Sequence, residues 1–131
     1  MKRTALFIQM TGQKCSPEGG KVLFNEVLYA DGPVCLNPKN GSILLNACGR
    51  YRVNWWTALS NETAECAVYG LEVSGLGHLL GNAPASGQVC GFALFEAQGP
   101  TELSLVNLSG FEVLYNGCAP VQAALMLEEE L

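Results

Sequence analysis

Apolar and polar residues alternate along much of the chain in short segments. Glycine and proline interrupt these segments at intervals of about eight to twelve residues, a spacing typical of all-β domains. The dipeptide Asn40-Gly41 is the strongest hairpin signal, because tight hairpin turns need residues that tolerate positive φ. The pattern predicts strands over residues 4–11, 22–29 (in one or two pieces), 42–46, 50–59, 64–73, 78–80, 88–97, 102–108 and 121–127, with turns at 31–33, 37–41 and 60–63.

Four of these strands carry large apolar residues on both faces. Along 50–59, Tyr51, Val53 and Trp55 share one face, while Trp56 lies on the other. A half-exposed strand should instead alternate apolar with polar residues. Large exposed apolar patches usually mark interaction surfaces, so the pattern predicts that this sheet packs against other copies of the chain. The alternative is that one of the two tryptophans is simply exposed to solvent, as single apolar residues often are. The other three strands are 4–11, 88–97 and 121–127, and the candidate interface residues are Phe7, Trp56, Phe92, Leu94 and Met126.

The C-terminal segment "AALMLEEEL", residues 123–131, allows two interpretations. Its residues favour a helix by intrinsic propensity. The longer segment "PVQAALML" also fits a strand, and "LEEE" is then most simply a solvated tail.

Length and composition predict a single domain over residues 1–131 that buries part of its surface between subunits. The chain has 131 residues, of which 49% are hydrophobic and 15% charged. A typical globular chain carries about 25% charged residues. So small a charged share leaves too little polar surface to cover a monomer.

Charge and hydropathy argue against a nucleic-acid partner, a transmembrane helix and a signal peptide. The formal net charge is −5, and the seven lysine and arginine residues are scattered, so there is no basic stripe for nucleic acid. No apolar run reaches the roughly 18 residues of a transmembrane helix. The apolar run at residues 5–10 is too short for a signal peptide, and we expect a first β-strand there.

Several motifs, in this order, resemble the globular head domain of the tumour-necrosis-factor-like and complement-q-like superfamily. They are Phe24-Asn25 before a short strand, an N-P-x-x-G turn at Asn37, Pro38 and Gly41, the Gly49-x-Tyr51 step into the long central strand, and "GQVCGFALFEAQGPTELSLVNLSG" at 87–110. The chain looks most similar to the C-terminal domains of bacterial spore-surface collagen-like glycoproteins of the BclA type. It carries no Gly-x-y repeat, so the likeness is to a head without a collagen stalk.

This resemblance implies a jelly-roll β-sandwich of about ten antiparallel strands that forms a tight homotrimer. The first, central, penultimate and last long strands would share the inner sheet. Those are the strands that alternation marks as apolar on both faces. In this arrangement Tyr51, Val53 and Trp55 enter the core, and Trp56 faces a neighbouring subunit.

Six cysteines are spread along the chain without a C-x-x-C motif, which argues against a zinc or redox site. Cys66 and Cys90 lie within predicted strands. One interpretation is that they are small buried hydrophobic residues of a protein kept reduced in the cytosol. Cys15, Cys35 and Cys118 lie in loops or beside glycine and proline, and we predict that these three cross-link within or between chains.

The sequence predicts no enzyme, no metal site and no cofactor. His78 is the only histidine, and it lies in "GLGHLLG" without a G-x-S-x-G nucleophile motif. A cupin-like metal enzyme needs clustered histidine and acidic ligands, which one histidine cannot supply. We therefore expect no catalytic, cofactor-binding or metal-binding residue.

The function expected from these observations is structural: a self-assembling homotrimer of the bacterial spore exosporium, coat or a spore appendage. Such a protein is made in the mother-cell cytoplasm without a signal peptide and can contact other spore-surface proteins. A protein outside spores would be cytoplasmic on the same reasoning. The alternative is a trimeric module of the same fold that binds a ligand or receptor through the loops at 31–40 and 75–87.

Overall fold

The alternating segments form antiparallel strands. The computed structural model describes residues 3–60, 67–82 and 87–130, with the backbone alone at 78 and 80–82, and no described residue is helical. No described segment forms a helix that could cross a membrane. The described strands are β1 (Ala5–Met10), β2 (Cys15–Ser16), β3 (Glu26–Asp31), β4 (Val34–Asn37), β5 (Ser42–Leu45), β6 (Gly49–Ala58), β7 (Val68–Val73), β8 (Gly77–Asn82), β9 (Gln88–Ala97), β10 (Thr101–Asn107), β11 (Val113–Leu114) and β12 (Ala123–Glu130).

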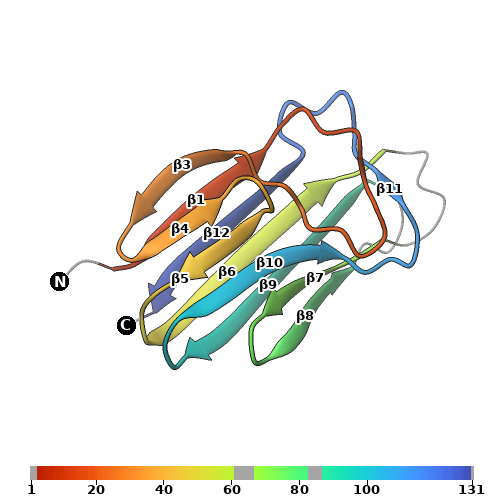
Figure 1. Cartoon of the computed structure of the whole chain (residues 1–131). Helices are drawn as coiled ribbons and strands as arrows, with labels where there is room; N and C mark the ends of the chain where they lie inside the picture. The colour runs from red at the N-terminus through yellow and green to blue at the C-terminus, as the bar shows by residue number, and fades with distance from the viewer. Residues whose placement is uncertain (1–2, 61–66, 83–86, 131) are drawn as a thin grey trace.

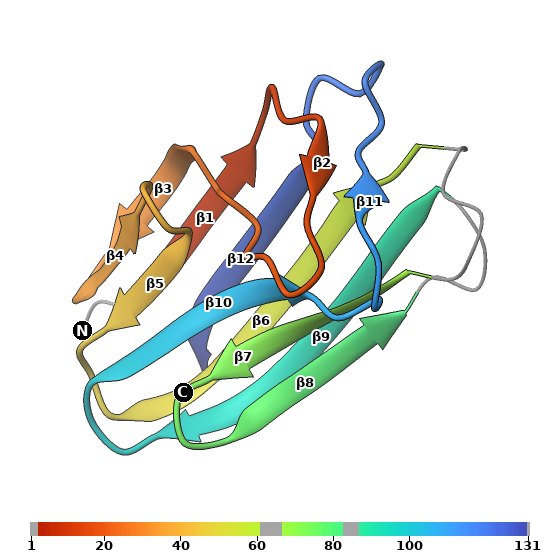
Figure 2. The same ribbon diagram turned by 45° about the vertical axis from the view of Figure 1, so that its right-hand side comes forward.

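Two five-stranded sheets pack face to face. One, here called the β12 sheet, has the order β3-β1-β12-β6-β9, and the other, the β10 sheet, has the order β4-β5-β10-β7-β8. The short pair β2 and β11 lies at the end of the sandwich away from the two chain termini (Figures 1 and 2). This is a jelly-roll sandwich, and the predicted fold class is confirmed. The four strands predicted to share a sheet, β1, β6, β9 and β12, do so.

Alternation places one set of side chains from each sheet in a common core. On β6, Tyr51, Val53 and Trp55 are buried, as predicted, and Trp56 is on the opposite face. The Trp55 indole lies against Gly91, its register partner on β9, where a Cβ atom would overlap the ring. Gly91 thus makes room for the largest side chain of the core.

The turn at 37–41 joins β4 to β5 as a hairpin in which Asn37 pairs with Ser42. Gly41 has φ +75°, and a Cβ atom there would overlap the carbonyl oxygen of Val22. Both the conformation and the close approach require glycine, so the N-P-x-x-G signal predicted this turn correctly.

One strand prediction needs correction, and three short strands were missed. The segment 22–29 is not a strand along its whole length: Val22 and Phe24 are buried in irregular chain, and β3 begins only at Glu26. β5 pairs only with the first half of β10. Beside the second half lies the irregular chain before β3, where Lys21 forms an isolated bridge with Val106. The strands β2, β4 and β11 were not predicted. β2 and β11 have two residues each, too few to show a period of two, and β4 lies between the predicted turns at 31–33 and 37–41. The predicted strand 64–73 is described only from residue 67, and the turn at 60–63 only at residue 60.

The C-terminal segment is a strand and not a helix, and its acidic end is not a free tail. β12 extends through Glu130 and pairs with β6 along its whole length. Glu128 and Glu130 lie opposite Arg52 and Arg50. The opposite charges of these arginines offset the repulsion between the glutamates of β12.

Candidate interaction face

The outward face of the β12 sheet, here called the β12 face, carries an apolar row that crosses all five strands. Antiparallel register partners point to the same side of a sheet. Tyr29 of β3 pairs with Phe7 of β1, and Phe7 pairs with Met126 of β12. Met126 pairs with Asn54 of β6, and Asn54 pairs with Phe92 of β9. Four of the five residues in this row are large and apolar.

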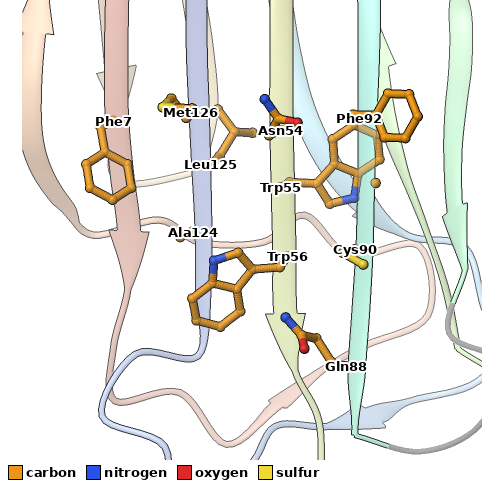
Figure 3. Close-up of a pocket in the computed structure, with 11 residues that line it drawn as sticks. Phe7, Asn54, Trp55, Trp56, Gln88, Cys90, Phe92, Ala124, Leu125 and Met126 are labelled. Carbon is orange, nitrogen blue, oxygen red and sulfur yellow. The ribbon is translucent and has the colours of Figure 1, made fainter.

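The next row of the β12 face is polar on β3 and β1 and less polar on the other three strands. It consists of Glu26, Gln9, Ala124, Trp56 and Cys90, each opposite its neighbour. Between the two rows lies an open groove of about 730 Å³ with the small residue Ala124 in its floor (Figure 3).

The five predicted interface residues all lie on this face. Phe7, Trp56, Phe92 and Met126 line the groove. Leu94 lies one row further along β9, opposite Arg52. Phe92 is 80% exposed and Leu94 56% exposed, so neither contributes to the core of its own chain. The structure brings the five together; their role as an interface remains a prediction.

Sequence reasoning missed Tyr29, which is 57% exposed at the outer end of the apolar row. The register of β1 with β3 shifts between Phe7 and Ile8, so one extra residue of β3 is accommodated there. This bulge reverses the sides expected from simple alternation along β3. Only the pairing of β3 with β1 reveals that Tyr29 lies beside Phe7.

The β12 face becomes charged toward the end of the sandwich at which the chain termini lie (Figure 1). Arg52 contacts Glu128 at 2.8 Å and Glu130 at 3.8 Å, and Arg50 contacts Glu130 at 3.5 Å. These ion pairs are half exposed, so each contributes little to the stability of a single chain. The β12 face therefore has a direction, with charged rows at one end and apolar rows in the middle.

The described cysteines are exposed free thiols: Cys15, Cys35, Cys48, Cys90 and Cys118. The interpretation of Cys90 as a buried hydrophobic residue is wrong for the single chain, because its side chain points outward from β9 into the groove (Figure 3). Cys66 lies outside the described residues. Cys15, Cys35 and Cys118 are exposed free thiols, as cross-linking between chains would require, and cross-linking stays a prediction.

The described residues contain no group of three or more histidine, cysteine or acidic side chains that could hold a metal ion. The arrangement nearest to a nucleophile site is a polar chain on the β10 sheet. Lys21 Nζ donates to Ser42 Oγ at 3.1 Å, and Ser42 Oγ lies 3.4 Å from Ser104 Oγ. Ser42 is 2% exposed and Ser104 3% exposed, and Lys21 also lies 3.9 Å from Glu102. No substrate can reach these hydroxyls, so the chain of contacts is structural.

Besides Tyr51, two further buried tyrosines, Tyr69 and Tyr115, lie in the core, away from the β12 face. Burial is the main cause that raises the pKa of the Tyr69 phenol well above its usual range. Burial also raises the pKa of Tyr115. Both phenols therefore stay neutral near pH 7 and serve as packing groups.

No protein-family model matches the chain, and no curated protein sequence matches it significantly. Solved structures do match over almost its whole length. Murine APRIL superposes with a TM-score of 0.76 at 9% identity, covering 98% of this chain and 100% of that chain. The globular domain of zebrafish complement 1qA gives a TM-score of 0.70 at 13% identity, covering 97% of this chain and 95% of that chain.

The fold is the TNF-like jelly roll. Eiger TNF from S. frugiperda matches as well, with a TM-score of 0.68 at 13% identity, covering 100% of this chain and 94% of that chain. At these identities the likeness concerns the fold alone. The TNF-like and complement-q-like part of the predicted resemblance is thus supported at the level of the fold. The closer likeness to spore-surface glycoproteins stays a prediction.

Proposed function

We propose that this chain is a non-enzymatic, self-assembling module that forms a homotrimer through the β12 face. The observation that carries the proposal is the apolar row from Tyr29 to Phe92, which remains exposed in the single chain. Monomeric proteins rarely expose contiguous apolar patches of this kind. Aromatic side chains bury roughly 150–250 Å² each, so a few of them supply a large part of the roughly 800 Å² per partner in a stable interface.

The direction of the β12 face favours a cyclic arrangement. Rotation about an axis roughly parallel to the strands places charged rows next to charged rows and apolar rows next to apolar rows. Reversing one subunit would bring the ion pairs of Arg50 and Arg52 toward the apolar row of its neighbour. Burying those charges without their usual solvation is costly, so a closed arrangement whose symmetry axis runs roughly along the strands is the better solution.

We further propose that trimers assemble into a bacterial spore-surface layer, as the predicted resemblance to spore glycoproteins implies. Exposed Cys15, Cys35 and Cys118 support this proposal, because they lie off the β12 face and are free for bonds between trimers or to other spore-surface proteins. In this proposal the protein is made in the mother-cell cytoplasm, and its thiols become oxidised after that cell lyses.

The first experiment is the absolute mass in solution, measured by light scattering on a sizing column with and without reductant. The chain mass is 14.0 kDa. A mass of three chains in both conditions is the expected result for the trimer. Larger species that fall to three chains in reductant would support cross-linking between trimers. A monomer at all concentrations would refute the trimer and the role of the β12 face.

A second candidate function is that the trimer binds a ligand or receptor. The observation that favours it is a further set of exposed apolar residues in or just before the outer strand β3: Leu23, Val27 and Leu28. These residues lie off the two rows of the β12 face and would stay available in a trimer. Protein and glycan arrays probed with the trimer would test this function. Binding that is lost in a Leu28→Asp variant of unchanged mass would support it, and silence on both arrays would count against it.

A further inference from the structure

Asn54 is the polar exception in the apolar row of the β12 face. Its register partners on either side are Met126 and Phe92. The amide lies on β6 between them, one row away from Trp56 on the same strand (Figure 3). Within the described residues the Asn54 side chain makes no hydrogen bond, and as an exposed group it is left to solvent in the single chain.

Any surface that covers the apolar row must also cover this amide. Asn54 lies inside the row and not at its margin, so Met126 and Phe92 cannot both be buried while Asn54 stays in water. A buried amide without a hydrogen-bond partner is strongly unfavourable. The covering surface must therefore present a hydrogen-bonding group at this one position.

A second copy of the same chain meets that requirement. When neighbouring subunits run in the same direction, the row that contains Asn54 meets the same row of the neighbour. An amide offers both an acceptor oxygen and two donor hydrogens, so Asn54 side chains can satisfy one another around a closed ring. A copy displaced by one row along the strand would instead bring Asn54 against the neighbour's Ala124 and Trp56. The hydrogen-bonding side chains of that row, Gln9 and Glu26, lie two and three strands away from β6, so the amide would be less well satisfied.

We infer that Asn54 is the residue that fixes the register and the number of subunits in the assembly. The inference rests on the proposed trimer and names the side chain that favours one register and one number of subunits over the alternatives. The physical precedent is general: a single buried asparagine in a coiled coil specifies register and oligomeric state at some cost in stability. Asn54 has the same character, one amide within an otherwise apolar contact surface.

The test uses two substitutions of Asn54 in the full chain. Asn54→Leu keeps the approximate side-chain size and removes the hydrogen-bonding requirement. We expect this variant to assemble at equal or lower concentration than the wild type but with several masses in place of one. Asn54→Asp places like charges together, and we expect the concentration for half-assembly to rise at least about tenfold at neutral pH. Acidification, which protonates the carboxyl group, should restore assembly.

The matched control is Asn46→Leu, the same substitution at an exposed residue before β6. Native mass spectrometry and sedimentation should show the wild-type mass distribution for this control. A single trimeric mass for Asn54→Leu, or a neutral-pH assembly of Asn54→Asp equal to that of the wild type, would overturn the inference and leave the proposed trimer intact. A monomeric wild type would overturn both, and would do so before any variant is made.

Discussion

The two outward faces of this sandwich follow different rules. The outward side of the β10 sheet is mostly polar: Lys21 covers Ser42, and Glu102 and Glu72 project from neighbouring strands. Among the described strand residues of the β10 sheet, Leu44 is the large apolar residue that is exposed on this side. The β12 face has the reverse composition, with aromatic residues in its middle, ion pairs at one end and Glu26 on the outer strand β3.

This difference shows that the excess of apolar residues in the chain is local. A sheet with one solvated face alternates apolar and polar residues, and the β10 sheet does so. The β12 sheet is apolar on both sides, as sheets are when both faces are covered. One side of it is covered by the β10 sheet, and we propose that a second molecule covers the other.

The comparison predicts opposite outcomes for one substitution made on each face. Phe92→Asp places a carboxylate in the middle of the proposed contact, and the cost of desolvating that charge should shift the mass from three chains to one. Leu44→Asp makes a similar change on the β10 sheet, where the side chain faces water, and should leave the mass unchanged. Light scattering over a range of protein concentrations measures both. Equal behaviour of the two variants would contradict the distinction between the faces.

Alternation alone predicted the β12 face on four of its five strands. The sequence places Phe7, Trp56, Phe92 and Met126 opposite the core side of their own strands, and a period of two requires no knowledge of the neighbours. The same reasoning separated Trp55 from Trp56. Local pattern was sufficient here because these strands are long and regular.

The remaining features depend on pairing between distant segments, which a local pattern does not contain. Tyr29 joins the row only through the bulge opposite Phe7 and Ile8. Asn54 becomes an exception only when its partners on β12 and β9 are known. The local pattern of three successive glutamates at 128–130 indicates a solvated tail, whereas in the structure Glu128 and Glu130 pair with Arg52 and Arg50 on the adjacent strand.

The comparison can be sharpened by a change beneath the β12 face. Gly91→Ala should destabilise the chain by about 1–3 kcal/mol, because the added methyl group must displace the Trp55 ring from a packed core. Gly99 has no atom within 4 Å of the position that a Cβ atom would take, so Gly99→Ala should change stability by less than about 0.5 kcal/mol. Urea unfolding at one fixed protein concentration measures both. An unaffected Gly91→Ala variant would contradict the close contact with Trp55.

Thiol reactivity offers a chemical comparison of the two faces. Cys90 lies on the β12 face and Cys35 on the edge strand of the β10 sheet, and both are exposed in the single chain. In the assembly, we expect Cys90 to react with a maleimide at least about tenfold more slowly than Cys35, since a tenfold protection needs only about 1.4 kcal/mol of favourable assembly. Peptide mapping by mass spectrometry resolves each cysteine. Protection should disappear in the Phe92→Asp variant; equal rates in the wild type would argue that the β12 face is uncovered.

The smallest effect is expected at the charged end of the β12 face. Arg52→Ala removes contacts to Glu128 and Glu130, but exposed ion pairs contribute only about 0–1 kcal/mol. Any loss of stability should shrink further at about 1 M salt, where the screening length falls to roughly 3 Å. Lys39→Ala, at an exposed turn residue, is the control for removing one positive charge. Thermal unfolding of both variants at low and high salt measures the difference. A loss well above 1 kcal/mol that persists in salt would mean that Arg52 is desolvated in the assembly, and the contact between subunits would then extend over the charged rows as well as the apolar ones.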